Sequence, residues 1–388
     1  MYEPFPGNYV WNLSVNICLG MGGAIGEIDR ANDKVREIAR LGDDLGTEAF
    51  FDSWNAMAEQ LVELGDEAEA AGHSLSAAEK YRRATAYYIT AERMQSRRYE
   101  PRKAAYQAML RTMSRAVSAG ALNCQRVDIS YDGSSFPALF VRGDGDGPRP
   151  CMVFCNGLDS VKEMIYLAVR ETFARRGISV LMVDQPGVGE ALRLNGLHAI
   201  VESERWAGAA VDYLETRADV DPARIGMMGW SLGGYFAPRA AAFEKRFKLC
   251  VAWGANHNWG ELQRRRLARE GDRPVPHYWD HVMWVWGQET MDAFMAFTPR
   301  VSLEGVAEKI TVPFLITHGA NDRQIPIQYA HQTYAEARNS PRRELKIFSE
   351  REGGVEHVSA DNMEPVCSYI ADWVADSFGG MSAAVADK

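Results

Sequence analysis

The chain has 388 residues, of which 46% are hydrophobic and 10% aromatic, and its formal net charge is −9. This length and composition are enough to bury a large core and to form one α/β domain together with a second element. The acidic balance, without any basic block, argues against nucleic acid as a partner, and no apolar run approaches the length of a membrane span.

The N-terminus and the cysteines favour a cytoplasmic protein. Residues 1–4, Met-Tyr-Glu-Pro, lack the basic and apolar regions of a signal peptide. The six cysteines are scattered, and several lie in apolar runs, as small buried hydrophobes do in a reducing compartment. Cys151 and Cys155 would point to one side of a strand, but two further zinc ligands are missing. We therefore expect neither a metal nor a cofactor.

The first third of the chain has a helical pattern from about residue 27 to 120. Segments 50–64 and 76–93 place apolar residues three and four apart, with charged residues between them. Ser76 and Glu79 resemble a capping box that opens the second of these helices. We expect residues 1–122 to form a helical segment that acts as a lid or as a homodimer element.

Strands begin near Gln125. Residues 127–131 and 136–141 flank an Asp-Gly-Ser-Ser sequence, which predicts a hairpin. Short apolar runs then alternate with helical patterns, which predicts a doubly wound, mostly parallel sheet with helices on both faces. These runs are residues 151–155, 178–183, 225–228 and 249–253. The predicted parts are a core in two pieces (123–255 and 307–380), a helical cap insertion (256–306) and a flexible tail (381–388).

Residues 229–234, Gly-Trp-Ser-Leu-Gly-Gly, directly follow one of these apolar runs. A buried strand that ends in Gly-x-Ser-x-Gly and passes at once into a helix is typical of a nucleophile elbow. The glycines permit a turn too tight for side chains, and the strain of that turn exposes the serine Oγ beside the first N–H groups of the helix. Ser231 is the candidate nucleophile, and the alternative is an ordinary turn serine.

Two further strands supply partners for this serine. Residues 312–319 lead into a loop that contains Asp322, and residues 345–348 precede a loop that contains His357. Ser, then Asp, then His is the chain order of the α/β-hydrolases. In their chemistry an imidazole takes the serine proton, and a buried carboxylate fixes the tautomer of that imidazole. We assign His357 as the general base and Asp322 as the orienting carboxylate.

Both assignments have simpler alternatives. Asp322 could cap a helix that begins near Ile327, and His357 could be a solvated loop histidine. Other carboxylates close enough in the chain to replace Asp322 are Glu350, Glu352 and Asp361. The α/β pattern ends with a helix expected over residues 362–377.

Two strand ends carry backbone groups of interest. Residues 156–159, Asn-Gly-Leu-Asp, follow the first buried strand, where this fold places half of its oxyanion hole. The N–H groups of Leu158 and Leu232 would hold the negative oxygen of a tetrahedral intermediate. Residues 184–190 form a glycine-rich turn after the next strand, but no Gly-Lys-Ser/Thr follows, which disfavours a phosphate site.

The insertion at 256–306 is rich in aromatic residues, in the position where α/β-hydrolases carry cap elements. The candidate substrate-pocket residues are Trp230, His257, Trp259, Tyr278 and Trp284. His277 and His281 have the spacing of helical zinc ligands, but they lack the Glu of His-Glu-x-x-His, which favours packing or pocket lining.

Residues 156–163, 184–190 and 229–235 together resemble one branch of the α/β-hydrolases. This branch includes 2,6-dihydroxypseudooxynicotine hydrolase and the polyketide chain-shortening hydrolases of pigment pathways. The resemblance covers nearly the whole chain, including the helical N-terminal segment that most esterases lack. It implies cleavage of a carbon–carbon bond beside a ketone, in a retro-Claisen sense, on an aromatic or polyketide-like small molecule.

The same resemblance implies a proton donor, because the leaving group is a carbanion that must be protonated as it departs. A carboxyl group in the cap is associated with this task in the nicotine-pathway enzyme, and the nearest match here is Glu261. The simpler alternative is a helix-start carboxylate that faces water, before the three arginines 264–266.

Three functional hypotheses remain from the sequence. The first is the C–C bond hydrolase, and the second is a carboxylic ester or thioester hydrolase with the same triad. The third is a catalytically idle α/β-hydrolase fold that binds or regulates a partner. A fluorophosphonate probe separates the third from the others, because an idle fold would not be labelled.

Overall fold

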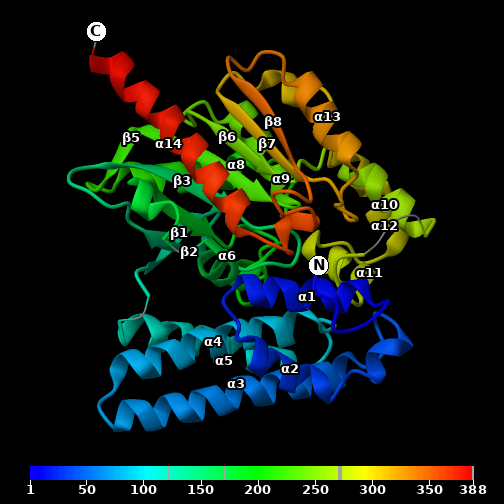
Figure 1. Cartoon of the computed structure of the whole chain (residues 1–388). Coiled ribbons are helices and arrows are strands. Elements are labelled where there is room, and N and C mark those ends of the chain that lie inside the picture. The colour runs from blue at the N-terminus through cyan, green and yellow to red at the C-terminus, as the bar shows by residue number, and fades with distance from the viewer. Residues whose placement is uncertain (121, 170, 270–272, 387–388) are drawn as a thin grey trace. The chain divides into compact units, whose positions relative to one another are not determined.

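The computed structural model describes residues 1–386 apart from 121, 170 and 270–272, and in it the chain divides into two units. The first unit comprises Met1–Cys124 and Asp272–Val282, and the second comprises Gln125–Gly271 and Met283–Lys388 (Figure 1). The segment 272–282 therefore groups with the N-terminal helices, whereas the sequence pattern predicts that it belongs to the cap insertion.

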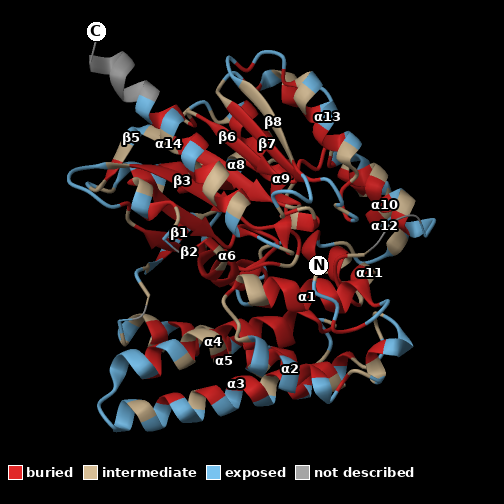
Figure 2. Ribbon diagram, viewed as in Figure 1, coloured by how far each residue is buried: buried red, intermediate tan, exposed pale blue. Residues whose placement is uncertain are grey.

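The first unit is helical. Its helices are α1 (Tyr9–Gly20), α2 (Ile25–Asp33), α3 (Thr47–Ala70), α4 (Ser74–Arg93) and α5 (Pro101–Ser118), with a short 3-10 helix at Ile38–Leu41. The sequence pattern did not reveal α1. Its first ten residues are all buried, so the helix lacks the alternation of apolar and charged residues that marks an amphipathic helix (Figure 2). The capping box was also wrong, because α4 begins two residues before Ser76 and its N-cap residue, His73, makes no side-chain capping bond.

Helices α3 and α4 pack closely at one glycine. A Cβ atom on Gly65 would lie 2.3 Å from the ring of Tyr81. That ring is fixed, because the Tyr81 hydroxyl lies 2.9 Å from Asp66 and 3.0 Å from Glu69, and the Arg115 guanidinium lies 4.0 Å from the ring centre. The two helices can therefore approach this closely only with glycine at position 65.

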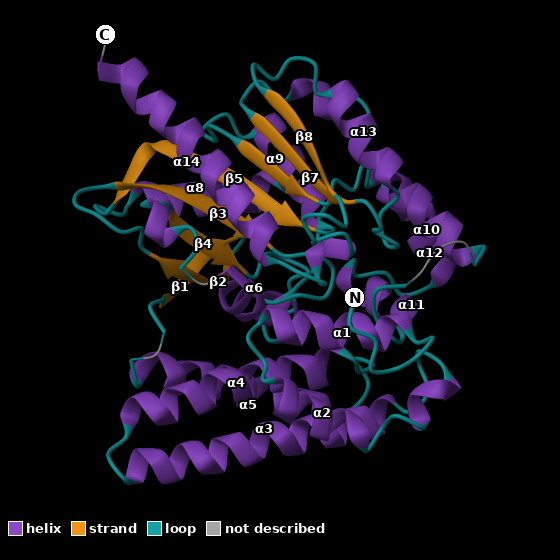
Figure 3. Cartoon of the chain, viewed as in Figure 1, coloured by secondary structure: helices purple, strands orange, loops and turns teal. Residues whose placement is uncertain are grey.

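The second unit is built on an eight-stranded sheet of order β1-β2-β4-β3-β5-β6-β7-β8 (Figure 3). The strands are β1 (Gln125–Tyr131), β2 (Ser134–Val141), β3 (Arg149–Cys155), β4 (Ser179–Val183), β5 (Val220–Trp230), β6 (Cys250–Trp253), β7 (Phe314–Gly319) and β8 (Arg343–Phe348). β1 and β2 are the predicted antiparallel hairpin, β2 pairs antiparallel with β4, and all the other pairs are parallel. The predicted doubly wound, mostly parallel sheet is confirmed.

The register brings three strand ends together. Trp230 at the end of β5 pairs with Trp253 at the end of β6, and Trp253 pairs with Thr317 near the end of β7. Because the carboxyl ends of parallel strands share one edge of a sheet, the loops after these strands converge there. The candidate site lies at this edge.

Helices cover both faces of the sheet. α14 crosses in front of it, and α8 and α9 lie behind it (Figure 1). The helices outside the insertion are α6 (Lys162–Val169), α7 (Gly189–Arg193), α8 (Glu204–Glu215), α9 (Gly233–Phe243), α13 (Ile327–Glu336) and α14 (Glu364–Ala386). α14 includes residues 381–386, so the prediction of a flexible tail over 381–388 is wrong for these residues, and residues 387–388 lie outside the described part.

The insertion between β6 and β7 contributes α10 (Trp259–Leu267), α11 (Tyr278–Val285) and α12 (Met291–Phe297). The boundary between the two units falls within α11. In the second unit, Trp259 packs against Trp286 and Phe294, so the insertion has a small aromatic core of its own. None of the helices that the structure describes is both long and apolar enough to cross a membrane.

The close approach at Gly65 predicts a difference between two helical glycines of the first unit. Gly65→Ala is expected to lower the free energy of unfolding by about 1–3 kcal/mol, because the new methyl group meets a ring that cannot move away. Gly26→Ala in α2 has nothing within 4 Å and is expected to raise it by roughly 0.5–1 kcal/mol through helix propensity. Chemical denaturation of both variants is the measurement, and equal effects would contradict the packing argument.

Candidate active site

The turn between β5 and α9 holds Ser231 in a strained conformation. β5 ends at Trp230, α9 begins at Gly233, and Ser231 between them has φ +56°. A non-glycine residue in this left-handed region is uncommon and marks strain that the surrounding structure must stabilise. The Ser231 N–H donates to the Trp253 carbonyl at 2.9 Å, which ties the strained residue to the neighbouring strand.

Glycines around Ser231 allow other backbone segments to come close. A Cβ on Gly229 would lie 2.5 Å from both Cys155 Sγ and the Gly233 carbonyl oxygen. A Cβ on Gly234 would lie 2.0 Å from the Gly254 carbonyl oxygen. These distances are shorter than any real Cβ contact, so the turn depends on glycine at both positions.

Ser231, His357 and Asp322 form one hydrogen-bonded series. Ser231 Oγ lies 2.9 Å from His357 Nε2, and His357 Nδ1 lies 2.9 Å from Asp322 Oδ2 and 3.1 Å from Asp322 Oδ1. The three residues come from the loops after β5, β7 and β8. The side chains of His357 and Asp322 are almost wholly shielded from solvent. The structure thus brings together the three residues that the sequence pattern singled out.

The Asp322 carboxylate fixes the tautomer of the His357 imidazole. An ionised carboxylate only accepts, so Nδ1 of His357 carries the proton toward Asp322, and Nε2 accepts from the Ser231 hydroxyl. Burial raises the pKa of Asp322. The opposing attractions of His357 and His318 and the N–H of Ile325 outweigh it, so that the net pKa lies below its ordinary value. Asp322 is therefore ionised at neutral pH.

The loop that carries Asp322 is shaped around its carboxylate. Asp322 Oδ1 accepts from the N–H groups of Gln324 and Ile325 at 2.8 and 2.9 Å. The buried ring of His318, at the end of β7, lies with Nε2 3.0 Å from the Ile325 carbonyl. The helix α13 starts after Pro326 without a side-chain cap, so Asp322 does not serve as its cap.

Two of the alternative carboxylates have other partners. Asp361 accepts from the N–H groups of residues 354–356, at 2.8 to 3.2 Å, and so shapes the loop that leads to His357. Glu352 pairs with Lys346 and accepts from Ser349. His357 itself is buried rather than solvated.

The two backbone groups proposed for the oxyanion hole lie in segments next to Ser231. A Cβ on Gly157 would lie 3.0 Å from Ser231 Cβ, so the segment that contains Leu158 runs directly against the serine. Leu232 precedes the first residue of α9, and the first N–H groups of a helix have no acceptor within the helix. That the N–H groups of Leu158 and Leu232 donate to a substrate oxygen stays a prediction.

The five aromatic and histidine residues predicted to line the pocket have packing contacts. Trp230 packs edge-on against Phe154 and Trp253 in the core. His257 is buried between Thr333, 3.1 Å from its Nδ1, and Glu336, 3.3 Å from its Nε2, and burial lowers its pKa. A role in substrate binding remains untested for each of these side chains.

The other three of these residues lie in the insertion. Trp259 belongs to its aromatic core, and Tyr278 is buried in the first unit with its ring against Trp279. The half-buried Trp284 in the second unit has the Arg193 guanidinium 5.7 Å from its ring centre.

Glu261 lies in the first turn of α10 and points toward α13. Its carboxylate accepts a hydrogen bond from the Tyr329 hydroxyl at 2.9 Å, while its N–H is capped by Asn258. Tyr329 packs with Leu262 and Ile325, the latter from the Asp322 loop. The carboxylate is therefore half-buried and hydrogen-bonded rather than a freely solvated helix-start residue.

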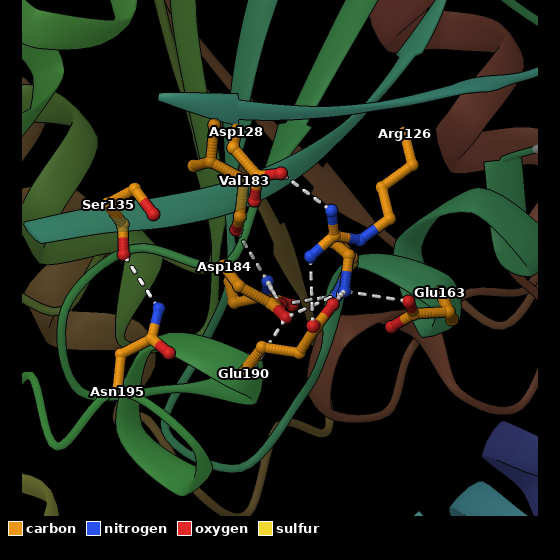
Figure 4. A network of polar contacts seen from close by, with 10 residues as sticks. Arg126, Asp128, Ser135, Glu163, Val183, Asp184, Glu190 and Asn195 are labelled. Carbon is orange, nitrogen blue, oxygen red and sulfur yellow. Dashed lines mark hydrogen bonds and ion pairs between the residues drawn. The ribbon is translucent and has the colours of Figure 1, made fainter. Parts of the chain in front are cut away.

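A buried group of charges lies beside the segment of Leu158. The Lys162 Nζ is within 2.5–3.1 Å of three carboxylates, those of Glu163, Asp184 and Glu190. Arg126 pairs with Glu190 at 3.0 Å and with the more exposed Asp128 (Figure 4). We call these six residues the charge cluster.

The members of the charge cluster differ in their titration. Burial lowers the pKa of Lys162, but Asp184, Glu163 and Glu190 together raise it above its ordinary value, so the amine is charged. Burial raises the pKa of Glu190, but Lys162 and Arg126 bring it below its ordinary value. Glu163 has a buried Oε2 without a hydrogen-bond partner among the described atoms, and burial raises its pKa to about 7.

Sequence reasoning missed several residues that support the site. Neither Lys162 nor Asp184 was assigned a role, although both lie in motifs that were noted. A charged residue directly after a buried strand, as Asp184 is, could have signalled a buried partner. Within the described part of the chain, no group of three His, Cys, Asp or Glu residues is arranged to hold a metal ion.

The parallel sheet and the hydrogen-bonded series at its carboxyl edge define an α/β-hydrolase. The chain belongs to the family described as Esterase FrsA-like, whose model matches residues 49–259. The model of the Prolyl oligopeptidase family matches residues 169–380. The predictions of an α/β-hydrolase fold and of an enzyme are confirmed.

Similar proteins agree with this assignment. The chain is 27% identical to Hydrolase acrC of Aspergillus aculeatus, over 71% of this chain and 74% of that protein. It is 26% identical to 2,6-dihydropseudooxynicotine hydrolase of Paenarthrobacter nicotinovorans, over 84% of each. The crystal structure of 2,6-dihydroxy-pseudo-oxynicotine hydrolase has the same fold, with a TM-score of 0.76 at 23% identity over 93% of this chain and 95% of that one. The predicted relationship to this branch is therefore confirmed.

The position of Glu163 predicts a pH-dependent effect on stability. The folded protein holds the Glu163 proton up to about pH 7, whereas the unfolded chain releases it near 4.5, so this residue lowers stability as pH rises between these values. Glu163→Gln keeps the shape and an acceptor for Lys162. It should therefore raise the free energy of unfolding above pH 7 by on the order of 3 kcal/mol and leave it nearly unchanged at pH 4, where the glutamate holds its proton in both states. Urea denaturation at both pH values is the measurement, and an equal difference at both would contradict the assignment.

Proposed function

We propose that the protein is a serine hydrolase that cleaves a carbon–carbon bond next to a ketone in an aromatic or polyketide-like small molecule. The observation that carries the serine chemistry is the series from Ser231 through His357 to Asp322, with contacts of 2.9 Å at each step. The choice of bond is supported by the similarity to 2,6-dihydropseudooxynicotine hydrolase, which extends over 84% of both chains.

In the first step Ser231 Oγ attacks the ketone carbon while its proton moves to His357 Nε2. Asp322 stabilises the imidazolium that forms. The carbonyl oxygen becomes an oxyanion, which the N–H groups of Leu158 and Leu232 stabilise. Donors of this kind act strongly because they are oriented before the charge develops.

In the second step the tetrahedral intermediate collapses and the carbon–carbon bond breaks. The bonding electrons leave with the departing carbon, which takes the proton from His357 Nε2 or one from the Glu261 carboxyl group. In the second case the proton on His357 Nε2 passes to the Glu261 carboxylate, so that the imidazole is again neutral before water attacks. The acyl group remains on Ser231. Water then attacks this ester with His357 as general base, and a carboxylic acid is released with Ser231 restored.

Ser231→Ala is expected to abolish hydrolysis and to leave the fold intact, because the turn accepts a small side chain. Loss of a triad member costs about 10⁴-fold or more in turnover. Steady-state rates and circular dichroism of purified protein are the measurements. If the variant kept more than about a tenth of the activity, Ser231 would not be an obligatory participant.

Glu261 is the candidate proton donor to the leaving carbon. Its contact with Tyr329 offers a way to hold the carboxyl group in one orientation. A carbanion needs this proton as the bond breaks, whereas the weakly basic aryloxide that leaves from a p-nitrophenyl ester does not. The role of Glu261 therefore depends on the bond that is cleaved.

Glu261→Gln is expected to slow C–C cleavage much more than residual ester hydrolysis. Tyr329→Phe is the matched variant, since it keeps the carboxyl group and removes only the hydroxyl that bonds to it, and should produce a smaller loss of the same kind. Rates on aryl ketones and on p-nitrophenyl esters are compared for both variants. Equal losses on the two substrate types would make Glu261 a structural residue.

A carboxylic ester or thioester hydrolase is the second candidate function. The observation in its favour is the match to the Esterase FrsA-like model over residues 49–259. The same Ser231 chemistry serves both bonds, and they differ in the leaving group. Assays of aryl ketones and β-diketones beside p-nitrophenyl esters separate them, because rapid ester turnover without any ketone cleavage would support the esterase.

Two further expectations remain open to direct tests. An idle binding or regulatory protein would fail to react with a fluorophosphonate, whereas the proposed enzyme reacts at Ser231. The mass of the protein in solution tests whether residues 1–122 act as a dimer element, since a homodimer would have twice the 43.3 kDa of the chain, whereas a lid within one chain would leave the mass at 43.3 kDa.

A further inference from the structure

The segment that carries Leu158 is fastened at both ends to the turn after β4. We call residues 156–162 the oxyanion loop. At its start, the Asn156 N–H donates to Gln185 Oε1 at 3.0 Å, and Gln185 Nε2 donates back to the Asn156 carbonyl at 2.9 Å. At its end, the Lys162 N–H donates to Asp184 Oδ1 at 2.7 Å. Two consecutive residues of one turn therefore hold both ends of the loop.

The Asp184 carboxylate is the centre of these contacts. Besides the Lys162 N–H, it accepts from Lys162 Nζ at 3.1 Å, from the Glu190 N–H at 2.9 Å and from Asn156 Nδ2 at 3.4 Å. The side chains of Lys162 and Asp184 are both fully buried. A buried charge is tolerated where it is paired and its hydrogen-bonding capacity is used, and this carboxylate meets both conditions.

The glycine-rich turn at 184–190 has a reason in this arrangement. Gly189 has φ +51°, and a Cβ there would lie 1.9 Å from the Asp184 carboxylate. Glycine at this position thus leaves room for the carboxylate and lets the Glu190 N–H reach it. The space inside this turn, for which the sequence disfavours a phosphate site, is filled by the Asp184 side chain.

The middle of the oxyanion loop is joined to the nucleophile turn. Ser160 Oγ accepts from the Gly157 N–H and from the indole Nε1 of Trp230, both at 3.0 Å. Trp230 directly precedes Ser231, and Gly157 runs against the Ser231 side chain. A shift of the loop would therefore change the position of the Leu158 N–H relative to Ser231 Oγ.

We propose that Asp184 and Lys162 are positioning residues, which hold the oxyanion loop so that the Leu158 N–H faces the developing oxyanion. The proposal rests on the serine hydrolase function proposed above. The pair does not touch the substrate and acts only through the loop. Both side chains are buried beneath the oxyanion loop, where water cannot easily replace a lost hydrogen bond.

The proposal predicts a specific kinetic defect in Asp184→Asn. The amide keeps the volume of the carboxylate but loses one acceptor oxygen and the charge that faces Lys162. Because a misplacement of about 1 Å costs about 100-fold, kcat is expected to fall by about 10- to 100-fold with little change in KM. A loss of stability alone would lower the amount of folded protein and leave the turnover of each folded molecule unchanged.

The test is the rate of inactivation by a fluorophosphonate, whose phosphoryl oxygen needs the same donors as an oxyanion. We expect wild type to be labelled, Asp184→Asn to be labelled about 10- to 100-fold more slowly per folded molecule, and Asp128→Asn to match wild type. Asp128 is the control, since it belongs to the charge cluster but is half-exposed and pairs with the exposed Arg126 rather than with Lys162. Labelling of Asp184→Asn at the wild-type rate overturns the positioning role, whereas absence of labelling in wild type overturns the hydrolase function beneath it.

A second variant covers the case in which Asp184→Asn does not fold. Lys162→Met together with Asp184→Asn removes both charges of the pair. Of the other two carboxylates at Lys162, Glu190 keeps Arg126 as its partner, and burial raises the pKa of Glu163 so that it stays protonated when the variant is assayed at pH 6. If this double variant folds and is still labelled slowly, with kcat reduced and KM kept, the positioning role is supported. If it folds and is labelled at the wild-type rate, the pair serves only stability and the proposal is wrong.

Discussion

The left-handed backbone of Ser231 is the constraint on which the rest of the site depends. A residue at φ +56° is stable only if its neighbours hold it there, and the structure does so with close backbone contacts. The Gly233 carbonyl lies against Gly229 and the Gly254 carbonyl lies against Gly234, where a side chain would leave no room. The Ser231 N–H donates to a carbonyl of β6. The turn therefore aims Oγ at the imidazole of His357 before any substrate binds, which is preorganisation in its simplest form.

The parts around this turn are held in different ways. The acid loop is folded around the Asp322 carboxylate, and Asp361 performs the same task for the loop of His357. The oxyanion loop is instead tied to the buried Asp184 by its backbone and by Lys162. In each case a carboxylate gathers backbone N–H groups, so loops at the sheet edge gain a rigidity that their lengths alone would not provide. The candidate catalytic residues thus lie on loops, and a carboxylate fixes the backbone of each loop.

Much of this arrangement could be predicted from the sequence, because it depends on local pattern. Strand-ending glycines next to Ser231, and the order of Asp322 and His357 after later strands, are visible without a structure. Helix α1 could not be predicted, since a helix buried on all sides has no polar stripe. Capping residues alone could not show whether α4 begins at Ser74 or at Ser76. The partners of Asp184 could not be predicted either, because a carboxylate that accepts hydrogen bonds from residues far away in the chain leaves no periodic pattern in the sequence. The contact of Glu261 with Tyr329 is of the same long-range kind.

In the proposed reaction Ser231 becomes covalently acylated when the substrate bond breaks. The most direct measurement is mass spectrometry of protein quenched in acid within milliseconds of mixing with a cleaved aryl ketone or ester, followed by peptide mapping. An added acyl mass is expected on the peptide that contains Ser231, and none is expected in Ser231→Ala. Full turnover of the substrate without any acylated Ser231, under conditions in which deacylation is slowed, would contradict it and would make Ser231 a residue that orients water instead.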